Sequence, residues 1–193
     1  MEQSRRLVLA SASRYRKELL ERLGLAFEVF SPEVDETPLG GELPADTALR
    51  LSLLKAAAAA KRGELIIAAD QVASCQGRRY DKPGSYDNAV RQLRELSGKT
   101  VEFHTAVTLL DSTKKTHESQ IVPCRVVFRP LDERRIQAYV GREKPYDCSA
   151  SAKAEGLGIA LIERIETDDP SSLIGLPLIA LTGMLERAGM PVL

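Results

Sequence analysis

The sequence contains few cysteines and no long apolar segment, and each shortage excludes a class of protein. Its three cysteines, Cys75, Cys124 and Cys148, form no Cys-x-x-Cys pair, so we expect neither a disulfide framework nor a zinc site. No apolar run approaches the roughly 20 residues that a membrane-spanning helix requires. The apolar residues at 7–10 are too few for the core of a signal peptide. These absences predict a cytoplasmic protein with reduced thiols and no membrane partner.

An excess of charge of either sign is also missing, because 27 Lys and Arg residues balance 27 Asp and Glu residues. Surfaces that bind nucleic acid or anionic membranes usually give a chain a basic excess. Aromatic residues make up only 5% of the sequence. We therefore expect no nucleic-acid partner, and any polyanionic ligand must be bound by a local cluster of Lys and Arg side chains.

The length of 193 residues and the apolar content of 44% suit a single globular domain over residues 1–193, or two small lobes that share a core. Apolar residues recur at strand or helical spacing along the chain. The predicted strands are 7–10, 27–30, 65–69, 100–110, 120–128 and 159–165, and the predicted helices are 14–23, 46–62, 85–96, 132–142 and 176–188. Strands that alternate with helices, together with one antiparallel pair, predict a mixed α/β sheet flanked by helices.

Residues 11–16 lie at the junction between the first predicted strand and the first predicted helix. Ser13 suits the N-cap of that helix, and the free backbone N–H groups and positive dipole end of a helix start favour anions. Arg14 and Arg16 add positive charge. The junction is therefore a candidate phosphate site, and an ordinary N-cap with two solvated arginines is the alternative. It lacks the glycines of a P-loop, which excludes a Walker-type nucleotide site.

The acidic segment Glu33-Val34-Asp35-Glu36 is a candidate metal site. A strand that continued past Pro32 would point Glu33 and Asp35 to the same face. Mg²⁺ and Mn²⁺ prefer such oxygen ligands. An acidic loop that faces solvent is the alternative, and the segment taken alone favours it.

Asp70 follows the apolar run 65–69, which has the unalternating pattern of a central strand covered on both faces. We therefore expect Asp70 at the carboxyl end of that strand, the edge at which open α/β sheets bind ligands. A carboxylate there can bind a metal ion or take a proton from an attacking water. A turn or helix cap is the alternative, but Gln71-Val72-Ala73 continues as a strand would.

Lys55, Lys82 and Lys153 are candidate partners of phosphate groups. Lys82 precedes Pro83 in a predicted turn, and Lys153 lies shortly before a predicted strand. Taken singly, each lysine is best interpreted as a solvated surface residue. The two histidines are far apart in sequence, so we interpret both as structural or surface residues.

Taken together, these segments resemble the Maf family of nucleoside triphosphate pyrophosphatases over nearly the whole chain. One such motif would carry little weight, but seven occur in the family's order. They are Leu9-Ala10-Ser11-Ala12-Ser13 with Arg16, Glu33-Val34-Asp35-Glu36, Lys55, Ala69-Asp70-Gln71-Val72, Lys82-Pro83, Lys153-Ala154-Glu155-Gly156 and Gly175-Leu176-Pro177. The resemblance implies an α/β fold like that of the inosine triphosphatase group, with a cleft between two lobes, and a homodimer.

The resemblance further implies hydrolysis of a nucleoside triphosphate between its α and β phosphates, with a divalent cation, Mg²⁺ or Mn²⁺, as cofactor. Asp70 would accept the proton of the attacking water, and Glu33 and Asp70 would hold the metal ion. The phosphate-binding residues would be Ser11, Ser13, Arg16, Lys55, Lys82 and Lys153. Hydrolysis at a phosphoryl group requires such charge neutralisation and an oriented nucleophile. Whether Asp70 is base, metal ligand or both is left open.

Family members differ at three positions, which are Tyr15, Gln71 and Glu155 here. The set resembles the branch that acts on 7-methyl-GTP, with an aromatic residue, Gln and Glu, although Trp is more frequent there than Tyr. Glu155 could accept two hydrogen bonds from the N1–H and amino group of guanine, and a cationic methylated base favours an aromatic face. The implied role is the removal of modified nucleotides. A dTTP and UTP pyrophosphatase and a regulatory protein of septum formation are the alternatives.

Overall fold

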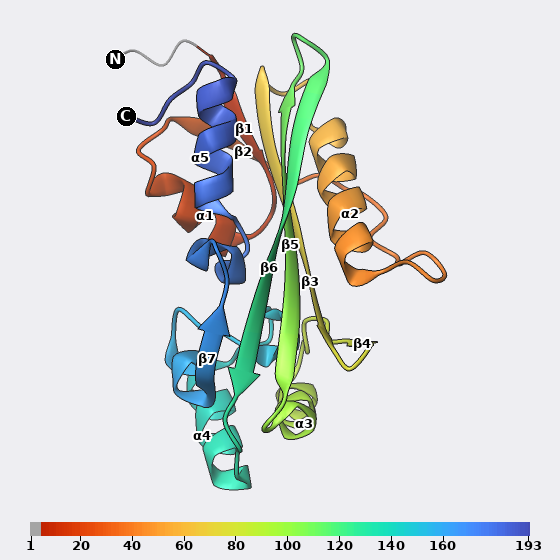
Figure 1. The fold of residues 1–193 in the computed structure, drawn as a ribbon, viewed down its shortest axis with the longest axis vertical. Helices are drawn as coiled ribbons and strands as arrows, with labels where there is room; N and C mark the ends of the chain where they lie inside the picture. Colours follow the sequence, from red (N-terminus) through yellow and green to blue (C-terminus); the bar gives the residue numbers. More distant parts are fainter. Residues whose placement is uncertain (1–4) are drawn as a thin grey trace. The chain divides into compact units, whose positions relative to one another are not determined.

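The computed structural model describes residues 5–193 (Figure 1). Residues 1–4, part of the chain start for which the sequence predicts no signal peptide, lie outside the described residues. The described chain forms a mixed seven-stranded sheet with five α-helices, which confirms the predicted α/β class. None of the helices between residues 5 and 193 is long and apolar enough to span a bilayer.

Strands and helices alternate along most of the chain. The strands are β1 Leu7–Ala10, β2 Phe27–Phe30, β3 Leu65–Cys75, β4 Arg78–Arg79, β5 Thr100–Asp111, β6 Thr116–Phe128 and β7 Ile162–Glu166. The α-helices are α1 Arg14–Glu21, α2 Pro44–Ala58, α3 Tyr86–Leu96, α4 Glu133–Glu143 and α5 Leu178–Arg187. Three short 3₁₀ helices are η1 Ser149–Ser151, η2 Leu157–Leu161 and η3 Pro170–Ile174.

The residues group into two compact units. The first unit consists of the residues up to 71, together with 105–122 and 169–193, and the second consists of 72–104 and 123–168. Strands β3, β5 and β6 each contribute residues to both units. The predicted site residues are therefore divided: Lys82, Lys153 and Glu155 belong to the second unit and the others to the first.

The core of the first unit explains why β1 and the start of β3 contain no polar residue. β1 pairs in parallel with β2 and with β3, so that Leu7 lies opposite Phe27 on one side and Leu65 on the other. Leu9 packs on one face of these strands with residues of α1 and α5, and Val8 packs on the other with the end of α2. Figure 1 shows α1 and α5 on one side of these strands and α2 on the other. The predicted burial of both faces is confirmed.

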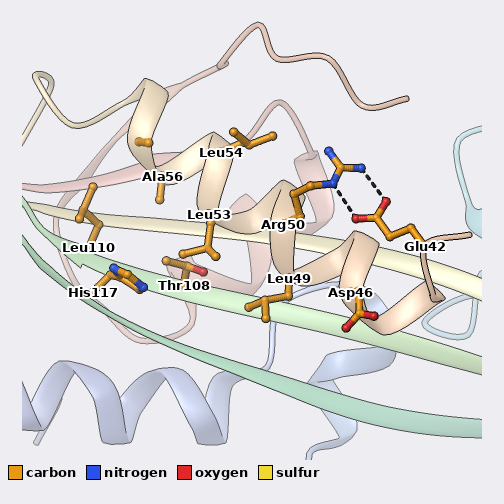
Figure 2. Close-up of a pocket in the computed structure, with 11 residues that line it drawn as sticks. Glu42, Asp46, Leu49, Arg50, Leu53, Leu54, Ala56, Thr108, Leu110 and His117 are labelled. Atoms are coloured by element: carbon orange, nitrogen blue, oxygen red, sulfur yellow. Dashed lines mark hydrogen bonds and ion pairs between the residues drawn. The ribbon is translucent and has the colours of Figure 1, made fainter. Parts of the chain in front are cut away.

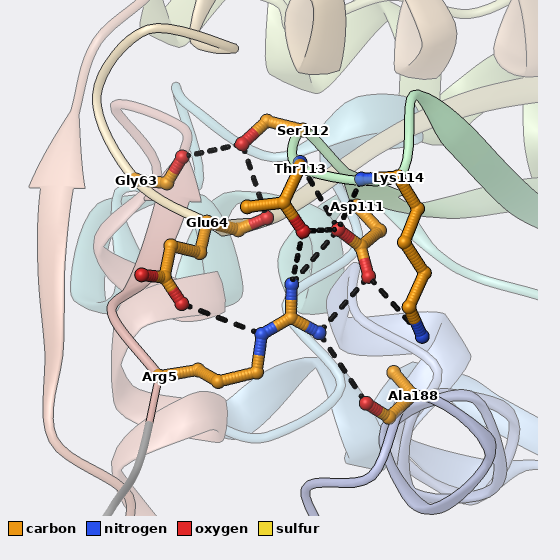
Figure 3. Close-up of polar contacts among 8 residues, drawn as sticks. All are labelled: Arg5, Gly63, Glu64, Asp111, Ser112, Thr113, Lys114 and Ala188. Atoms are coloured by element: carbon orange, nitrogen blue, oxygen red, sulfur yellow. Dashed lines mark hydrogen bonds and ion pairs between the residues drawn. The ribbon is translucent and has the colours of Figure 1, made fainter.

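Arg5 connects three distant parts of the first unit (Figure 3). Its guanidinium donates hydrogen bonds to both carboxylate oxygens of Asp111, at the end of β5, over 2.9 and 2.8 Å. It also donates to the carbonyl of Ala188, just after α5, and to the carboxylate of Glu64, just before β3. The guanidinium holds the pKa of Asp111 well below its usual range. This contact joins the start of the described chain to β3, β5 and α5.

The second unit contains the antiparallel pairs β6–β7 and β3–β4. Helices α3 and α4 pack against each other. Ser85 and Asp132 are their N-caps, and each side chain accepts a hydrogen bond from the backbone N–H three residues later. Both helices therefore begin within one residue of the predicted start.

The predicted strand 65–69 is too short. β3 continues to Cys75, because Val72 and Ala73 are buried strand residues like those before them. Asp70 therefore lies in the middle of β3 and not at its carboxyl end as predicted. The strand-like continuation at Gln71-Val72-Ala73, noted in the sequence, was the signal for the longer strand.

The predicted strand 159–165 begins too early. Residues Leu157–Leu161 form η2, in which the N–H of Gly158 donates a hydrogen bond to the carbonyl of Lys153. Strand β7 therefore begins only at Ile162. Helix α2 begins at Pro44 instead of residue 46, since proline is favourable in the first turn of a helix, and it ends at Ala58 instead of residue 62.

Candidate functional site

The residues of the predicted phosphate site meet at the start of α1. The Ser13 hydroxyl caps the helix by accepting a hydrogen bond from the Arg16 backbone N–H at 3.4 Å. The Ser11 hydroxyl accepts from the Ser13 backbone N–H at 3.1 Å and from the Arg16 guanidinium at 3.3 Å. Arg16 Nε donates to the Gly175 carbonyl at 2.8 Å. A helix N-terminus and a fixed guanidinium thus lie together, an arrangement whose charge suits an anion.

The Arg16 side chain is half-buried in this junction, whereas that of Arg14 is exposed. Removal from solvent lowers the pKa of the Arg16 guanidinium, while the negative charges of Asp70 and Glu36 oppose that shift. An arginine nevertheless stays protonated at neutral pH. The junction and the two carboxylates therefore interact as parts of one charged site in the first unit.

Lys55 of α2 connects two of the acidic residues. Its ammonium donates to Asp70 Oδ1 of β3 over 2.6 Å and lies 2.8 Å from Glu36 Oε1, in the loop after β2. Lys55 and Asp70 are buried, whereas the Glu36 side chain is 59% exposed. One cation thus lies between two carboxylates. Oxygen donors of this kind also suit a divalent metal ion.

The acidic segment lies in an exposed loop, the interpretation that the segment taken alone favoured, and not in a continuation of the strand. β2 ends at Phe30, because Pro32 has no N–H to continue the strand ladder, so Glu33 and Asp35 do not share a strand face. Hydrogen bonds from the side chain and then the backbone N–H of Thr37 instead lower the pKa of Asp35. Glu36 rather than Glu33 pairs with Lys55. Only the contact with α2 identifies Glu36, and the sequence pattern carries no signal for it.

Among residues 5–193, no group of three His, Cys, Asp or Glu side chains is placed to hold a metal ion. Glu33 is exposed in the same loop as Glu36. The carboxylates of Glu36 and Asp70 fit a hard cation by their donor chemistry, since they already share the ammonium of Lys55.

Asp70 and Gln71 are neighbours in β3 and therefore point to opposite faces of the sheet. Asp70 faces α2, where it meets Lys55. Gln71 faces η3, where its amide nitrogen donates to the backbone carbonyls of Ser172 and Leu173 at 2.9 and 3.1 Å. The same nitrogen donates to the Thr105 hydroxyl at 2.9 Å. Asp70 and Gln71 thus make their contacts on opposite faces of β3.

The contacts of Gln71 define which group its side chain can offer. The two hydrogens of the amide nitrogen are shared among three acceptors. One of these, the Thr105 hydroxyl, in turn donates to the Ser172 carbonyl at 3.0 Å. The carbonyl oxygen is therefore the end available to a ligand. The sequence suggested that Gln71 could donate or accept, and the structure restricts it to accepting. Thr105 and the η3 carbonyls are partners that sequence analysis missed.

Tyr15 lies in the first turn of α1 and is half-buried. The Arg14 guanidinium lies 4.7 Å from the centre of its ring and donates to its hydroxyl at 2.6 Å. A cation therefore already lies on an aromatic face, as expected for a cation–π contact.

The remaining predicted residues belong to the second unit. Lys153 pairs with Glu143, the last residue of α4, and Glu155 is exposed two residues further along the same loop. Lys82 is exposed between β4 and α3, in a turn where the carbonyl of Pro83 accepts a hydrogen bond from Asn88.

A separate apolar pocket of about 580 Å³ lies in the first unit, between α2 and strands β5 and β6 (Figure 2). Its walls include Leu49 and Leu53, and the ion pair of Arg50 with Glu42 lies at one end. Its lining contains none of the predicted site residues of the described chain. Among the described residues, the one guanidinium that lines this pocket is paired with Glu42, so this mainly apolar pocket is less suited to a triphosphate than the start of α1.

These features define a class: a mixed α/β protein in which a helix start with a fixed arginine lies in the same unit as a buried carboxylate paired with an ammonium group. The chain belongs to the Maf family, since the Maf-like protein family matches residues 6–188. It is 56% identical to the 7-methyl-GTP pyrophosphatase of Cupriavidus pinatubonensis over 96% of this chain and 94% of that protein. It is 53% identical to the proteins of the same name from Burkholderia thailandensis, over 97% and 89% of the two chains, and Bordetella avium, over 98% and 96%.

Proposed function

We propose that the protein is an enzyme that hydrolyses 7-methyl-GTP to 7-methyl-GMP and pyrophosphate, and so removes a modified nucleotide. The observation that carries this conclusion is its identity of more than 50% with proteins named for that activity, over nearly the full length of each chain. The site of the first unit supports the same chemistry, because it combines an anion-binding junction with buried charged groups.

In this proposal the phosphate groups bind where the Arg16 guanidinium and the positive dipole end of α1 provide positive charge. Ser11 and Ser13 hold that junction in place. Lys55 neutralises further charge, and Lys82 and Lys153 of the second unit are the other predicted phosphate partners. Positioning and charge neutralisation supply most of the catalysis in hydrolysis at a phosphoryl group.

Asp70 is the proposed acceptor for the proton of the attacking water. Its carboxylate is oriented by the hydrogen bond from Lys55, with both groups shielded from solvent. A base must be fixed within hydrogen-bond reach of the water that it activates. The rigid middle of β3 is well suited to that requirement.

A divalent ion, Mg²⁺ or Mn²⁺, is the proposed cofactor, with Asp70 and Glu36 as the carboxylates that would hold it and Glu33 as a further candidate. Mg²⁺ is commonly held by one or two carboxylates together with substrate phosphates. The ion would neutralise the charge that develops on the phosphate oxygens. Lys55 would then exchange part of its contact with these carboxylates for contact with the substrate.

Base selection is assigned to Tyr15, Gln71 and Glu155. The carbonyl oxygen of Gln71 and the exposed carboxylate of Glu155 are hydrogen-bond acceptors, which suits the N–H groups of guanine better than the carbonyl oxygens of uracil. An aromatic ring such as that of Tyr15 suits a cationic methylated base, which would bind on the face that Arg14 does not cover or would displace Arg14. We also propose a cytoplasmic homodimer, which size-exclusion chromatography with light scattering and cell fractionation would test.

The decisive experiment is pyrophosphate release from 7-methyl-GTP, GTP, dTTP, UTP and CTP with Mg²⁺ or Mn²⁺. Asp70→Asn is expected to abolish turnover. Asp46→Asn, the same substitution at an exposed position of α2, is the matched control and is expected to leave it unchanged. A preference for dTTP and UTP would keep the reaction and overturn the base assignment. Failure to hydrolyse any triphosphate would favour a regulatory binding protein instead.

A further inference from the structure

One carboxylate fixes both sides of the loop that carries Glu155. Glu143 ends α4, and its Oε1 accepts a hydrogen bond from the ammonium of Lys153. Its Oε2 accepts a hydrogen bond from the backbone N–H of Leu157 at 2.7 Å. The Glu143 side chain is only 12% exposed, whereas Glu155 is exposed. The two partners of Glu143 thus flank Glu155 by two residues on each side.

The 153–157 loop is built around this carboxylate. A methyl group on Gly156 would lie 2.7 Å from Glu143 Oε2, so glycine leaves the room that the carboxylate occupies. The N–H of Gly156 donates to the Lys153 carbonyl at 3.1 Å, which closes a tight turn. Tyr139, one helical turn before Glu143, accepts a hydrogen bond from the Lys153 backbone N–H at 3.1 Å. Helix α4 therefore holds the loop at three points.

Charge strengthens these contacts. The hydrogen bonds from Lys153 and from the Leu157 N–H lower the pKa of Glu143, and the same ion pair raises the pKa of Lys153. The negative charge of Glu155 also raises the pKa of Lys153. Hydrogen bonds between charged groups are shorter and stronger than neutral ones. The loop is consequently ordered before any ligand arrives.

We propose that Glu143 is a positioning residue for base selection, which acts by fixing the backbone from which Glu155 presents its carboxylate. The inference rests on the proposed function, in which Glu155 accepts hydrogen bonds from the guanine base. A loop that is ordered in advance loses less conformational entropy when the base binds. Loss of the Glu143 contacts should therefore weaken binding of 7-methyl-GTP and leave the chemical step nearly unchanged.

The test compares kcat and KM for 7-methyl-GTP and UTP in the wild type and in Glu143→Gln. We expect the variant to raise the KM for 7-methyl-GTP about tenfold, with little change in kcat or in the weak turnover of UTP. Glu133→Gln is the matched control, because it makes the same substitution on the same helix and affects only exposed contacts, the ion pair with Arg94 and the hydrogen bond from Gln137. It is expected to behave as the wild type.

Gly156→Ala disrupts the contact between Glu143 and the 153–157 loop by a change in the loop instead of in Glu143. The added methyl displaces the end of the flexible Glu143 side chain, so this variant loses the hydrogen bonds while Glu143 itself is unchanged. It should raise the KM as Glu143→Gln does, and the double variant should be no worse than either single variant. Gly156→Ala also decides the question if Glu143→Gln fails to fold.

Hydrogen exchange of the Leu157 amide provides a readout that does not depend on catalysis. This amide is expected to be protected in the wild type and to exchange faster in both variants. A wild type that releases no pyrophosphate from 7-methyl-GTP would overturn the proposed function and this inference with it. An active wild type, with variants that keep its KM for 7-methyl-GTP, would overturn only the role of Glu143.

Discussion

The ammonium of Lys55 and the carboxylate of Asp70 lie 2.6 Å apart, and the two residues are only 7% and 6% exposed. Removing two such charges from water costs free energy that their attraction repays only in part, so a buried ion pair adds little net stability. Removing one partner is far more costly, because it leaves the other charge buried alone. The burial of this ion pair is therefore better explained by a role in the candidate site than by a gain in stability.

Lys55→Met is expected to reduce the free energy of unfolding by about 3–5 kcal/mol, because Asp70 loses its buried partner. Lys55→Met/Asp70→Asn, which removes both charges, should recover part of that loss. Urea unfolding at neutral pH measures both variants. Equal stability of Lys55→Met and the wild type would contradict the burial of this pair.

Asp111 should make the stability of the first unit sensitive to acid. Its pKa is lowered in the folded chain by Arg5, so the stabilisation is present above the unfolded pKa, about 3.9, and is lost as the pH falls toward the folded value. Asp111→Asn should be less stable near neutral pH and should lose less stability on acidification. Urea unfolding across the pH range tests this, with Glu133→Gln as an exposed control that should have little effect.

Gln71→Glu is expected to destabilise the protein by about 1–3 kcal/mol, because a carboxylate oxygen would replace the amide nitrogen that donates to Ser172 and Leu173. The unpaired carbonyls and the repulsion should also disorder η3 and lower activity. Thermal unfolding and pyrophosphate release measure the two effects. An unchanged melting temperature would show that the nitrogen does not make these bonds.

Tyr15→Trp should increase the preference for 7-methyl-GTP over GTP by a factor of roughly 2–5, because indole is the stronger cation–π partner and such contacts contribute about 0.5–1 kcal/mol. Tyr15→Leu should decrease the same ratio. Tyr86→Trp, at an exposed residue of α3, is the control. An increase for both substrates alike would show that the ring does not recognise the charge of the base.

Chelation by EDTA should abolish turnover, and Mg²⁺ or Mn²⁺ should restore it. Glu36→Gln should raise the metal concentration needed for half-maximal rate, because it removes one of the carboxylates proposed to hold the ion. Glu33→Gln is the matched variant, because Glu33 is the residue of this loop that the sequence analysis assigned to the metal ion. The metal concentration for half-maximal rate is compared between the two variants. A larger effect of Glu33→Gln than of Glu36→Gln would reverse the assignment.

The fold was largely predictable because its signals are local. The Ser13 cap, the apolar run that starts β3 and the Ser85 and Asp132 caps each depend on a few neighbouring residues. The error at 159–161 has a different origin. A short apolar run fits a strand or a turn of helix equally well, and here the hydrogen bonds to Lys153 and the contact with Glu143 decide the outcome.

The site was predictable only in part. Ser11, Ser13 and Arg16 were found because they are close in sequence, and the structure brings them together. Glu36 required a contact with Lys55, and the orientation of Gln71 required three acceptors more than 30 residues away in the chain. Such partners depend on tertiary packing, and no spacing rule along the sequence specifies them.

The alternation of β3 also has an evolutionary consequence. Because Asp70 and Gln71 project to opposite faces, a substitution at Gln71 alters the side toward η3 and leaves the Lys55 side intact. With the roles proposed for these two residues, a change at Gln71 would alter the preferred nucleotide while the proposed hydrolytic residues stayed in place. Insertion of a single residue into the strand would exchange the two faces and abolish both properties at once.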